Sequence, residues 1–351
     1  MIAFMIALVN FIDFYVGNFI RKILELRTKD IQYRQLLEKI LKEGTPVTTP
    51  QGEGALRIIG AQMRFDLSNG APIITERDIL TAPSKNSLSG VHATIAELTA
   101  FMNGATTHEE LSRYGCTWWK RWTTREQLDH CELFHLKEGD LGPGSYGAGF
   151  HHFPTAEGIP FNQLKHVVEQ IIELPHLRTH LMTTWIPQYA GRGSGKRREV
   201  AVAPCHGTVL HFQVDTVSRE LSLHHVQRSG DVPVGVVFNL VQYSALLLMV
   251  AQVTGYKAKE LVYTISDAHI YDSQVADVKA LLKTRIGTFP DLVIKDRLIT
   301  SPIAGLECFS DDLRVADHTE KITDIFAFRH TDFEVIGYRP AAGRKKIWTP
   351  T

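Results

Sequence analysis

The chain has 351 residues, with 38 basic against 38 acidic side chains and a hydrophobic content of 44%. This balance excludes the strong basic field that draws proteins to nucleic acid or to an anionic membrane surface, so we expect neither as a partner. The length suits one large core or two modest domains.

Cysteine usage points to a reducing compartment. No CxxC pair occurs among the four cysteines, which are Cys116, Cys131, Cys205 and Cys308. Their wide spacing disfavours a disulfide framework or a structural zinc site, so we expect a cytoplasmic protein without a metal.

Residues 1–30 form an apolar extension, and its first twenty residues are long enough to span a bilayer. The run contains Asn10, Asp13 and Asn18, lacks a basic residue ahead of it and offers no small-residue cleavage site, so it makes a poor signal peptide. An amphipathic docking helix or a poorly ordered extension is favoured over a membrane anchor. The irregular apolar period leaves these readings open.

The first elements follow from apolar spacing and from glycine and proline. Residues 31–43 repeat apolar side chains at helical spacing, which predicts a helix that ends before Gly44-Thr45-Pro46. Residues 55–67 alternate as strands do, with a bend or bulge expected at Gly60. Residues 94–104 predict a helix. Residues 139–151 contain five glycines, which predicts a loop whose backbone approaches a neighbour closely.

The later elements are denser. Residues 161–174 predict an amphipathic helix, and residues 191–199 predict a basic surface loop, where simple solvation is favoured over phosphate binding. A hairpin, a long apolar helix that should be buried and a further strand are then expected over residues 208–214 with 220–229, 238–255 and 260–271. The elements do not alternate as βαβ units, so we expect a single α+β domain with a mixed or antiparallel central sheet and a long buried helix.

Nine short motifs occur in an order that resembles the thymidylate synthases and their relatives. The three most informative are APCH, QRSGDVPVGVVFN and SDAHIY, at residues 203–206, 227–239 and 266–271. The others are EGTP, GAQMRFDL, ELTAFMNG, GDLGPGSYG, LRTHLMTTW and TDFEVIGYRP. The resemblance covers about residues 31–351 and implies one catalytic domain of that family's fold over this range.

The resemblance implies transfer of one carbon from 5,10-methylenetetrahydrofolate to C5 of a pyrimidine nucleoside monophosphate. C5 of uracil is a poor nucleophile, and addition of a thiolate at C6 activates it. Cys205 would be that nucleophile, and the cation of Arg228 would lower the pKa of its thiol. The alternative for Cys205 is an inert buried thiol.

The resemblance also implies the residues that bind the nucleotide. Arg228 and Ser229 would contact the phosphate. Asn239 would donate to O4 and accept from N3–H of the pyrimidine, which favours uracil, because relatives that act on cytosine tend to carry aspartate there. A helix N-cap is a compatible reading of Asn239. His269 and Tyr271, two residues apart on a strand, would hold the sugar 3′-hydroxyl from one face.

Five further residues match positions around the reacting atoms. Glu97 would organise proton transfer near the pyrimidine, and a solvated glutamate is its alternative. Tyr146 matches a position beside the nucleophile, and His206 follows the nucleophile and would support the site. Asp231 and Trp119 match positions near the folate.

Several family positions are changed in this chain. Pro50 and Thr179 stand where two of the family's four phosphate arginines are expected. Arg178 remains, and because such arginines cross to the neighbouring active site, it implies a homodimer with shared sites. We expect Arg57, or the loop from Arg192 to Arg198, to supply the missing charge, or the phosphate to be held less tightly. Smaller departures are Lys120, Arg121, Ser266, Ser273 and Gln274.

The C-terminal residues GRKKIWTPT bear on the reaction outcome. A short apolar tail in thymidylate synthases keeps water from the exocyclic methylene, whereas a longer and more polar tail would admit water and give a hydroxymethyl group. We therefore expect 5-hydroxymethylation of deoxyuridylate, with reductive methylation to thymidylate as the alternative and a cytidylate substrate as a third. A catalytically silent scaffold is the reading from another class, and retention of Cys205, Arg228, Asn239, His269 and Tyr271 weighs against it.

Overall fold

A six-stranded sheet forms the centre of the fold in the computed structural model, which describes residues 27–192, 198–302 and 314–350. The strand order is β1-β2-β6-β5-β4-β3, and only β5 and β6 run parallel. The expected mixed sheet is therefore confirmed. Its strands are β1 (Thr45–Thr48), β2 (Gly54–Asp66), β3 (Leu181–Met182), β4 (Val209–Asp215), β5 (Glu220–Asp231) and β6 (Lys257–Tyr271).

Strands β4 and β5 form the predicted hairpin, and the segment predicted for residues 55–67 is the single strand β2. Gly60 within β2 has a φ of 73°, a left-handed value that glycine adopts at little cost. The pairing of β2 with β6 keeps one register on both sides of it, from Ile59 opposite Asp267 to Ala61 opposite Ile265. The pairing therefore continues past Gly60 without the register shift that a bulge would give.

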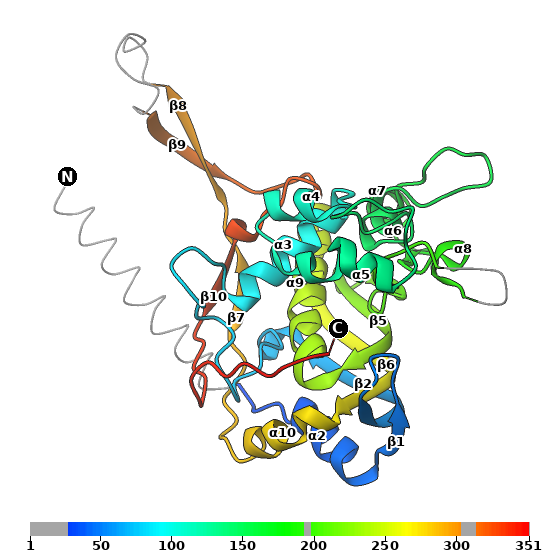
Figure 1. The fold of residues 1–351 in the computed structure, drawn as a ribbon. Coiled ribbons are helices and arrows are strands. Elements are labelled where there is room, and N and C mark those ends of the chain that lie inside the picture. The colour runs from blue at the N-terminus through cyan, green and yellow to red at the C-terminus, as the bar shows by residue number, and fades with distance from the viewer. Residues whose placement is uncertain (1–26, 193–197, 303–313, 351) are drawn as a thin grey trace.

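The parallel strands β5 and β6 are joined by the long helix α9 (Val237–Thr254), which is the expected buried helix. It packs against both strands and against α3 (Gly90–Met102), as Figure 1 shows. Leu240, Leu246 and Leu247 are wholly buried in it, and each such side chain stabilises the fold by about 2 kcal/mol. Together with the turn before it, Val232–Thr254 is the one stretch of the described residues long and apolar enough to cross a bilayer, and it lies mostly inside the core.

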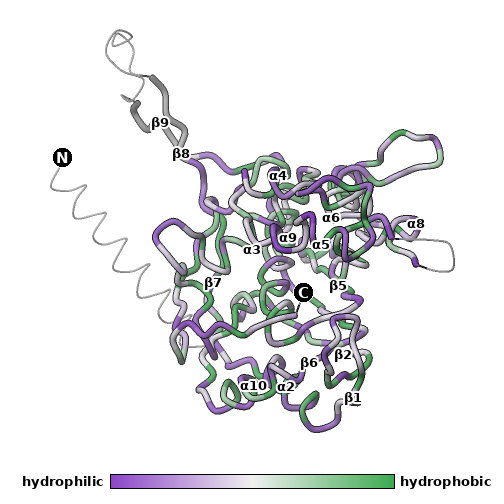
Figure 2. Tube along the Cα trace, viewed as in Figure 1, coloured by the Kyte–Doolittle hydropathy of each residue, from purple (hydrophilic) through white to green (hydrophobic). Residues whose placement is uncertain are grey.

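The predicted helices near residues 31–43, 94–104 and 161–174 correspond to α2 (Gln32–Glu43), α3 and α7 (Gln163–Glu173). The shorter helices are α4 (His108–Arg113), α5 (Arg125–His130), α6 (Tyr146–His151), α8 (Pro187–Ala190) and α10 (Val275–Leu281). In Figure 2 hydrophobic and hydrophilic stretches alternate along the chain, as expected for elements that bury one face.

The glycine-rich segment 139–151 is only partly the expected loop, because its last residues form α6. The glycines there allow close packing of this helix. A Cβ at Gly147 would lie 2.0 Å from the carbonyl oxygen of Ala105, and one at Gly149 would lie 2.8 Å from the Cα of Thr184. The sequence predicted the close approach correctly and the secondary structure wrongly.

Two small sheets complete the described fold. Strand β7 (Asp291–Ile294) pairs with β10 (Phe333–Ile336), and β8 (Arg297–Pro302) pairs with β9 (Arg314–Glu320). The β8–β9 pair projects from the body in Figure 1. Most of the apolar extension at residues 1–30, and most of the basic loop at residues 191–199, lie outside the described residues.

Candidate active site

The predicted nucleotide residues gather where the parallel strands end. Because the carboxyl ends of β5 and β6 meet at one edge of the sheet, a site forms there by topology. Asp231 of β5 lies opposite His269 of β6, and His269 lies opposite Arg57 of β2. Residues opposite one another on neighbouring strands share a face. His269 and Tyr271 are nearly buried, with ring centroids 4.9 Å apart.

Cys205 is held beside this edge by hydrogen bonds at its backbone. Its carbonyl oxygen accepts from the backbone N–H of Arg228 at 2.7 Å, which ties the segment before β4 to the end of β5. The hydroxyl oxygen of Tyr146, the first residue of α6, accepts from the backbone N–H of Cys205 at 2.8 Å. The same hydroxyl lies 3.3 Å from the Sγ atom of Cys205. Since its oxygen already accepts a backbone N–H, its proton is free to donate to the sulfur.

The expected net lowering of the pKa of Cys205 is wrong. Burial raises the pKa of the thiol, because the thiolate loses its hydration, while the hydrogen bond from Tyr146 and the charge of Arg228 act in the opposite direction. Arg228, predicted to lower this pKa, and Tyr146, predicted to lie beside the sulfur, both act in that direction, but burial outweighs them. The thiol is therefore mostly protonated at neutral pH.

Arg228 is exposed at the mouth of the site, and Ser229 beside it is half-buried. The Nε atom of Arg228 donates to the carbonyl oxygen of Pro204 at 3.2 Å, and its guanidinium lies 5.4 Å from the centre of the Trp185 ring. Both contacts hold the cation next to the Cys205 segment. An exposed guanidinium with free donors remains available to a phosphate.

Glu97 on α3 is buried, so the reading of a solvated glutamate is wrong. Its Oε1 accepts from the indole N–H of Trp118 at 2.6 Å and of Trp119 at 2.5 Å, and its Oε2 accepts from Gln242 at 3.0 Å. Burial raises the pKa of the carboxyl, and these three hydrogen bonds oppose the rise. A buried carboxylate with a raised pKa suits proton transfer near neutral pH.

Asn239 is not the N-cap of α9. A π-helical turn, Val232–Val236, precedes the helix, and Asp231 caps that turn by accepting from the N–H of Val234. The side chain of Asn239 is buried instead in a hydrogen-bonded chain. Its Oδ1 accepts from Gln227 at 3.2 Å, and its Nδ2 donates to Gln242 at 3.2 Å.

His206 packs against Tyr146 and Tyr243. Its ring stacks on Tyr146 with centroids 4.2 Å apart, and its Nδ1 lies 2.7 Å from the hydroxyl of Tyr243. Burial lowers the pKa of His206 to about 3, so the ring is neutral at physiological pH. It positions Tyr146 and carries no charge to the sulfur.

The C-terminal segment closes over Asp231 from the other side, and in Figure 1 its red trace ends beside α9 and β5. The hydroxyl of Thr349 donates to the Oδ2 of Asp231 at 2.5 Å. Gln274 donates to the same oxygen at 3.0 Å and to the carbonyl oxygen of Trp348 at 2.8 Å. Ile347 is buried, and Arg77 donates to the carbonyl oxygen of Lys345 at 2.9 Å.

Asp231 is thus a half-buried carboxylate under a closed segment. Burial raises its pKa, against the hydrogen bonds from Thr349 and Gln274. The oxygens of such a group can accept from the N–H donors of a pterin ring, so this acceptor fits a folate. Trp119 is nearly buried and donates to Glu97, so its contact with a folate stays a prediction.

None of the described contacts joins Arg178 to this cluster. It is exposed between α7 and β3, and its described contact is through its carbonyl oxygen, which accepts from His211. Three further residues of the site were missed by sequence reasoning, namely Gln227, Gln242 and Tyr263. The one available signal was a polar residue three positions after Asn239 in an apolar helix, which places both on one face.

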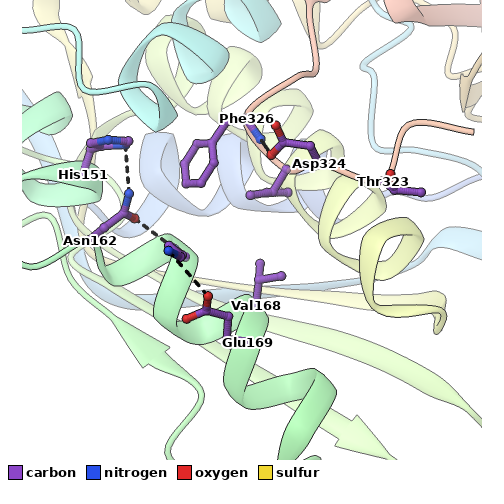
Figure 3. A pocket seen from close by; sticks show the side chains of 9 residues that line it. His151, Asn162, Val168, Glu169, Thr323, Asp324 and Phe326 are labelled. Atoms are coloured by element: carbon purple, nitrogen blue, oxygen red, sulfur yellow. Dashed lines mark hydrogen bonds and ion pairs between the residues drawn. The ribbon is translucent and has the colours of Figure 1, made fainter.

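A separate hollow of about 450 Å³ lies between α7 and the segment before β10. Figure 3 shows His151, Asn162 and Glu169 on one side of it and Asp324 and Phe326 on the other. Its lining includes none of the predicted site residues. Among the described residues, no group of three His, Cys, Asp or Glu side chains is arranged to hold a metal ion.

Comparison with known proteins agrees with this geometry. The family model described as thymidylate synthase matches residues 31–348. The chain is 33% identical over 299 residues to the thymidylate synthase of Human herpesvirus 8 type P (isolate GK18), an alignment that covers 83% of this chain and 81% of the viral protein. The chain carries the fold and folate-dependent transfer chemistry of such enzymes, with methylenetetrahydrofolate as co-substrate and a nucleoside monophosphate as acceptor. It belongs to the thymidylate synthase family.

Proposed function

We propose that this chain converts deoxyuridylate to thymidylate by reductive methylation, through a covalent bond from Cys205 to C6 of the pyrimidine. The observation that carries the proposal is the closed C-terminal segment, with Ile347 buried and Thr349 bonded to Asp231. A segment in that position excludes water from a reactive methylene at C5. The name of the viral relative, a thymidylate synthase, also supports this reading.

In this proposal Cys205 adds to C6 as a thiolate, with its proton passing to solvent or base, and C5 becomes nucleophilic. C5 then bonds to the methylene carbon of the folate, and loss of the C5 proton toward the side of Glu97 lets the folate leave. Hydride from the tetrahydrofolate reduces the exocyclic methylene to methyl, the folate becomes dihydrofolate, and the bond to Cys205 breaks. The residues of the chain orient, deprotonate and exclude water, while the folate supplies carbon and hydride.

For the nucleotide phosphate we propose Arg228 together with Arg57. Arg57 is half-buried and lies directly opposite His269, so it faces the end of the site where a sugar phosphate would lie. The replacement of two family arginines leaves room for such a cation. Arg178 is exposed, and its described contact is through its carbonyl oxygen; we propose that its side chain serves the site of a second copy in a homodimer with shared active sites.

Hydroxymethylation of the same nucleotide was favoured by the polar composition of the tail. That reading assumed a loose closure. The bond from Gln274 to the carbonyl oxygen of Trp348 and the bond from Thr349 to Asp231 use polar groups to close the segment, so polarity alone does not favour entry of water.

The test is incubation of the protein with deoxyuridylate and methylenetetrahydrofolate, with mass spectrometry of the nucleotide and absorbance of dihydrofolate. We expect a methyl product formed in step with dihydrofolate, and no product from Cys205→Ser. A hydroxymethyl product without dihydrofolate would overturn the reductive step. Absence of any product from the unmodified protein would favour the scaffold reading.

A further inference from the structure

Gln242 connects two residues of the site that perform different tasks. It lies on α9 with none of its surface exposed. Its Oε1 accepts from the Nδ2 of Asn239 at 3.2 Å, and its Nε2 donates to the Oε2 of Glu97 at 3.0 Å. One side chain therefore touches both the proposed pyrimidine reader and the proposed proton-transfer group.

The remaining capacity of the Asn239 amide matches uracil. A primary amide has two N–H donors and an oxygen with two lone pairs. Gln227 uses one lone pair and Gln242 uses one N–H. The free N–H and the free lone pair are complementary to a pyrimidine edge that offers an acceptor at position 4 and a donor at position 3. Uracil has this arrangement, and cytosine has the reverse.

The hydrogen-bonded series of side chains from Glu97 to Gln227 is fixed in direction at both of its ends. Gln242 cannot turn its amide without placing Oε1 against the acidic oxygen of Glu97, and this carboxylate accepts only donors. Gln227 is held the same way, because the hydroxyl of Tyr263 donates to its Oε1 while its Nε2 donates to the carbonyl oxygen of Ser229 at 2.9 Å. A turned Asn239 would leave two buried polar contacts unsatisfied.

We propose that Gln242 is a positioning residue that uses the Glu97 carboxylate as a fixed acceptor to hold Asn239 in the orientation that reads uracil. The proposal rests on the function above, since it assigns the selectivity of the same site. It also means that the proton-transfer group and the base-reading group share one hydrogen-bonded chain.

Two substitutions distinguish the hydrogen bond between Gln242 and Asn239 from the one between Gln242 and Glu97. Gln242→Met keeps the side-chain volume and removes both hydrogen bonds. We expect the dissociation constant of deoxycytidylate, divided by that of deoxyuridylate, to fall about fivefold, which is the effect of one neutral hydrogen bond. Gln242→Glu keeps the acceptor for Asn239 and removes the donor to Glu97. It should hold the ratio within about twofold while moving the acid limb of the activity profile to higher pH.

Isothermal titration calorimetry measures both dissociation constants without turnover, so it separates failure of this inference from failure of the proposed function. Ser244→Ala is the matched control, because Ser244 is buried on the same helix and donates only to the carbonyl oxygen of Leu240. An unchanged ratio in Gln242→Met, or an unchanged pH profile in Gln242→Glu, would overturn the proposal. The second variant decides the matter if the first does not fold.

Discussion

The pKa of the Cys205 thiol depends on the hydroxyl group of Tyr146 as much as on the nearby guanidinium of Arg228. Tyr146 bonds to both the backbone N–H and the Sγ atom of Cys205, and its ring is fixed by stacking on His206. Burial raises the pKa of the thiol, so any loss of hydrogen bonding leaves less thiolate at neutral pH.

Tyr146→Phe removes the hydroxyl and keeps the ring. We expect the rate of Cys205 alkylation by iodoacetamide at neutral pH to fall about tenfold or more, because a hydrogen bond to the charged sulfur is lost. The midpoint of the alkylation profile should move to higher pH, and kcat/KM should follow it. Cys205→Ser gives the background rate, and an unchanged profile would contradict the role given to the hydroxyl.

Glu97 makes a second prediction at this scale. Its folded pKa is raised above its unfolded value, so the folded state holds the proton more tightly and ionisation destabilises the fold as pH rises through this interval. The melting temperature of Glu97→Gln, relative to the unmodified protein, should therefore increase from acid toward neutral pH.

A constant offset from the altered hydrogen bond to Gln242 does not affect this slope. We also expect kcat of Glu97→Gln to fall about 100-fold, as for loss of a general acid or base. A difference in melting temperature that is flat with pH would mean that the pKa of Glu97 is the same in the folded and unfolded states, and would contradict the raised pKa.

At the scale of the element, the short helix α6 is placed by its glycines. Gly147 lies so close to the carbonyl oxygen of Ala105 that no side chain fits, and the helix starts at Tyr146. The packing of a backbone against a backbone therefore sets where the activating hydroxyl stands. Composition alone suggested a loop, because five glycines in thirteen residues are unfavourable for a helix.

Gly147→Ala should displace α6 from Ala105. We expect a loss of about 2 kcal/mol or more in the free energy of unfolding by denaturant, since the contact is with backbone that cannot move alone. Activity should fall further than stability, as Tyr146 moves with the helix. Gly343→Ala is the control, because a Cβ there meets no atom within 4 Å.

On the scale of the whole molecule, the sequence predicted features set by neighbouring residues and missed contacts between residues far apart in the chain. Local patterns gave the hairpin β4–β5 and the helix α9, and motifs gave Cys205, Glu97 and Asn239. The polar chain through Gln227 and Gln242 was missed because Gln242 and Glu97 lie 145 positions apart and meet only after folding. The direction of the Cys205 pKa was wrong for the same reason, since burial is a property of the assembled fold.

Removal of residues 347–351 tests the closure by the C-terminal segment. We expect the truncated protein to release part of its product as hydroxymethyl nucleotide, because water then reaches the exocyclic methylene. Product masses and dihydrofolate yield measure this partition. Trp348→Ala is the matched control, since the Trp348 side chain is exposed and its carbonyl oxygen makes the bond to Gln274. A truncated protein that still forms methyl product alone would show that closure does not depend on this segment.

Because Thr349 bonds to Asp231, the accessibility of the C-terminal residues to a protease also depends on whether a folate occupies the site. A pterin that takes Asp231 must either displace Thr349 or share the carboxylate with it, and each outcome alters how readily an exopeptidase trims the last residues. Digestion by carboxypeptidase, timed with and without each ligand, would therefore report folate binding in a sample that carries no label and performs no catalysis.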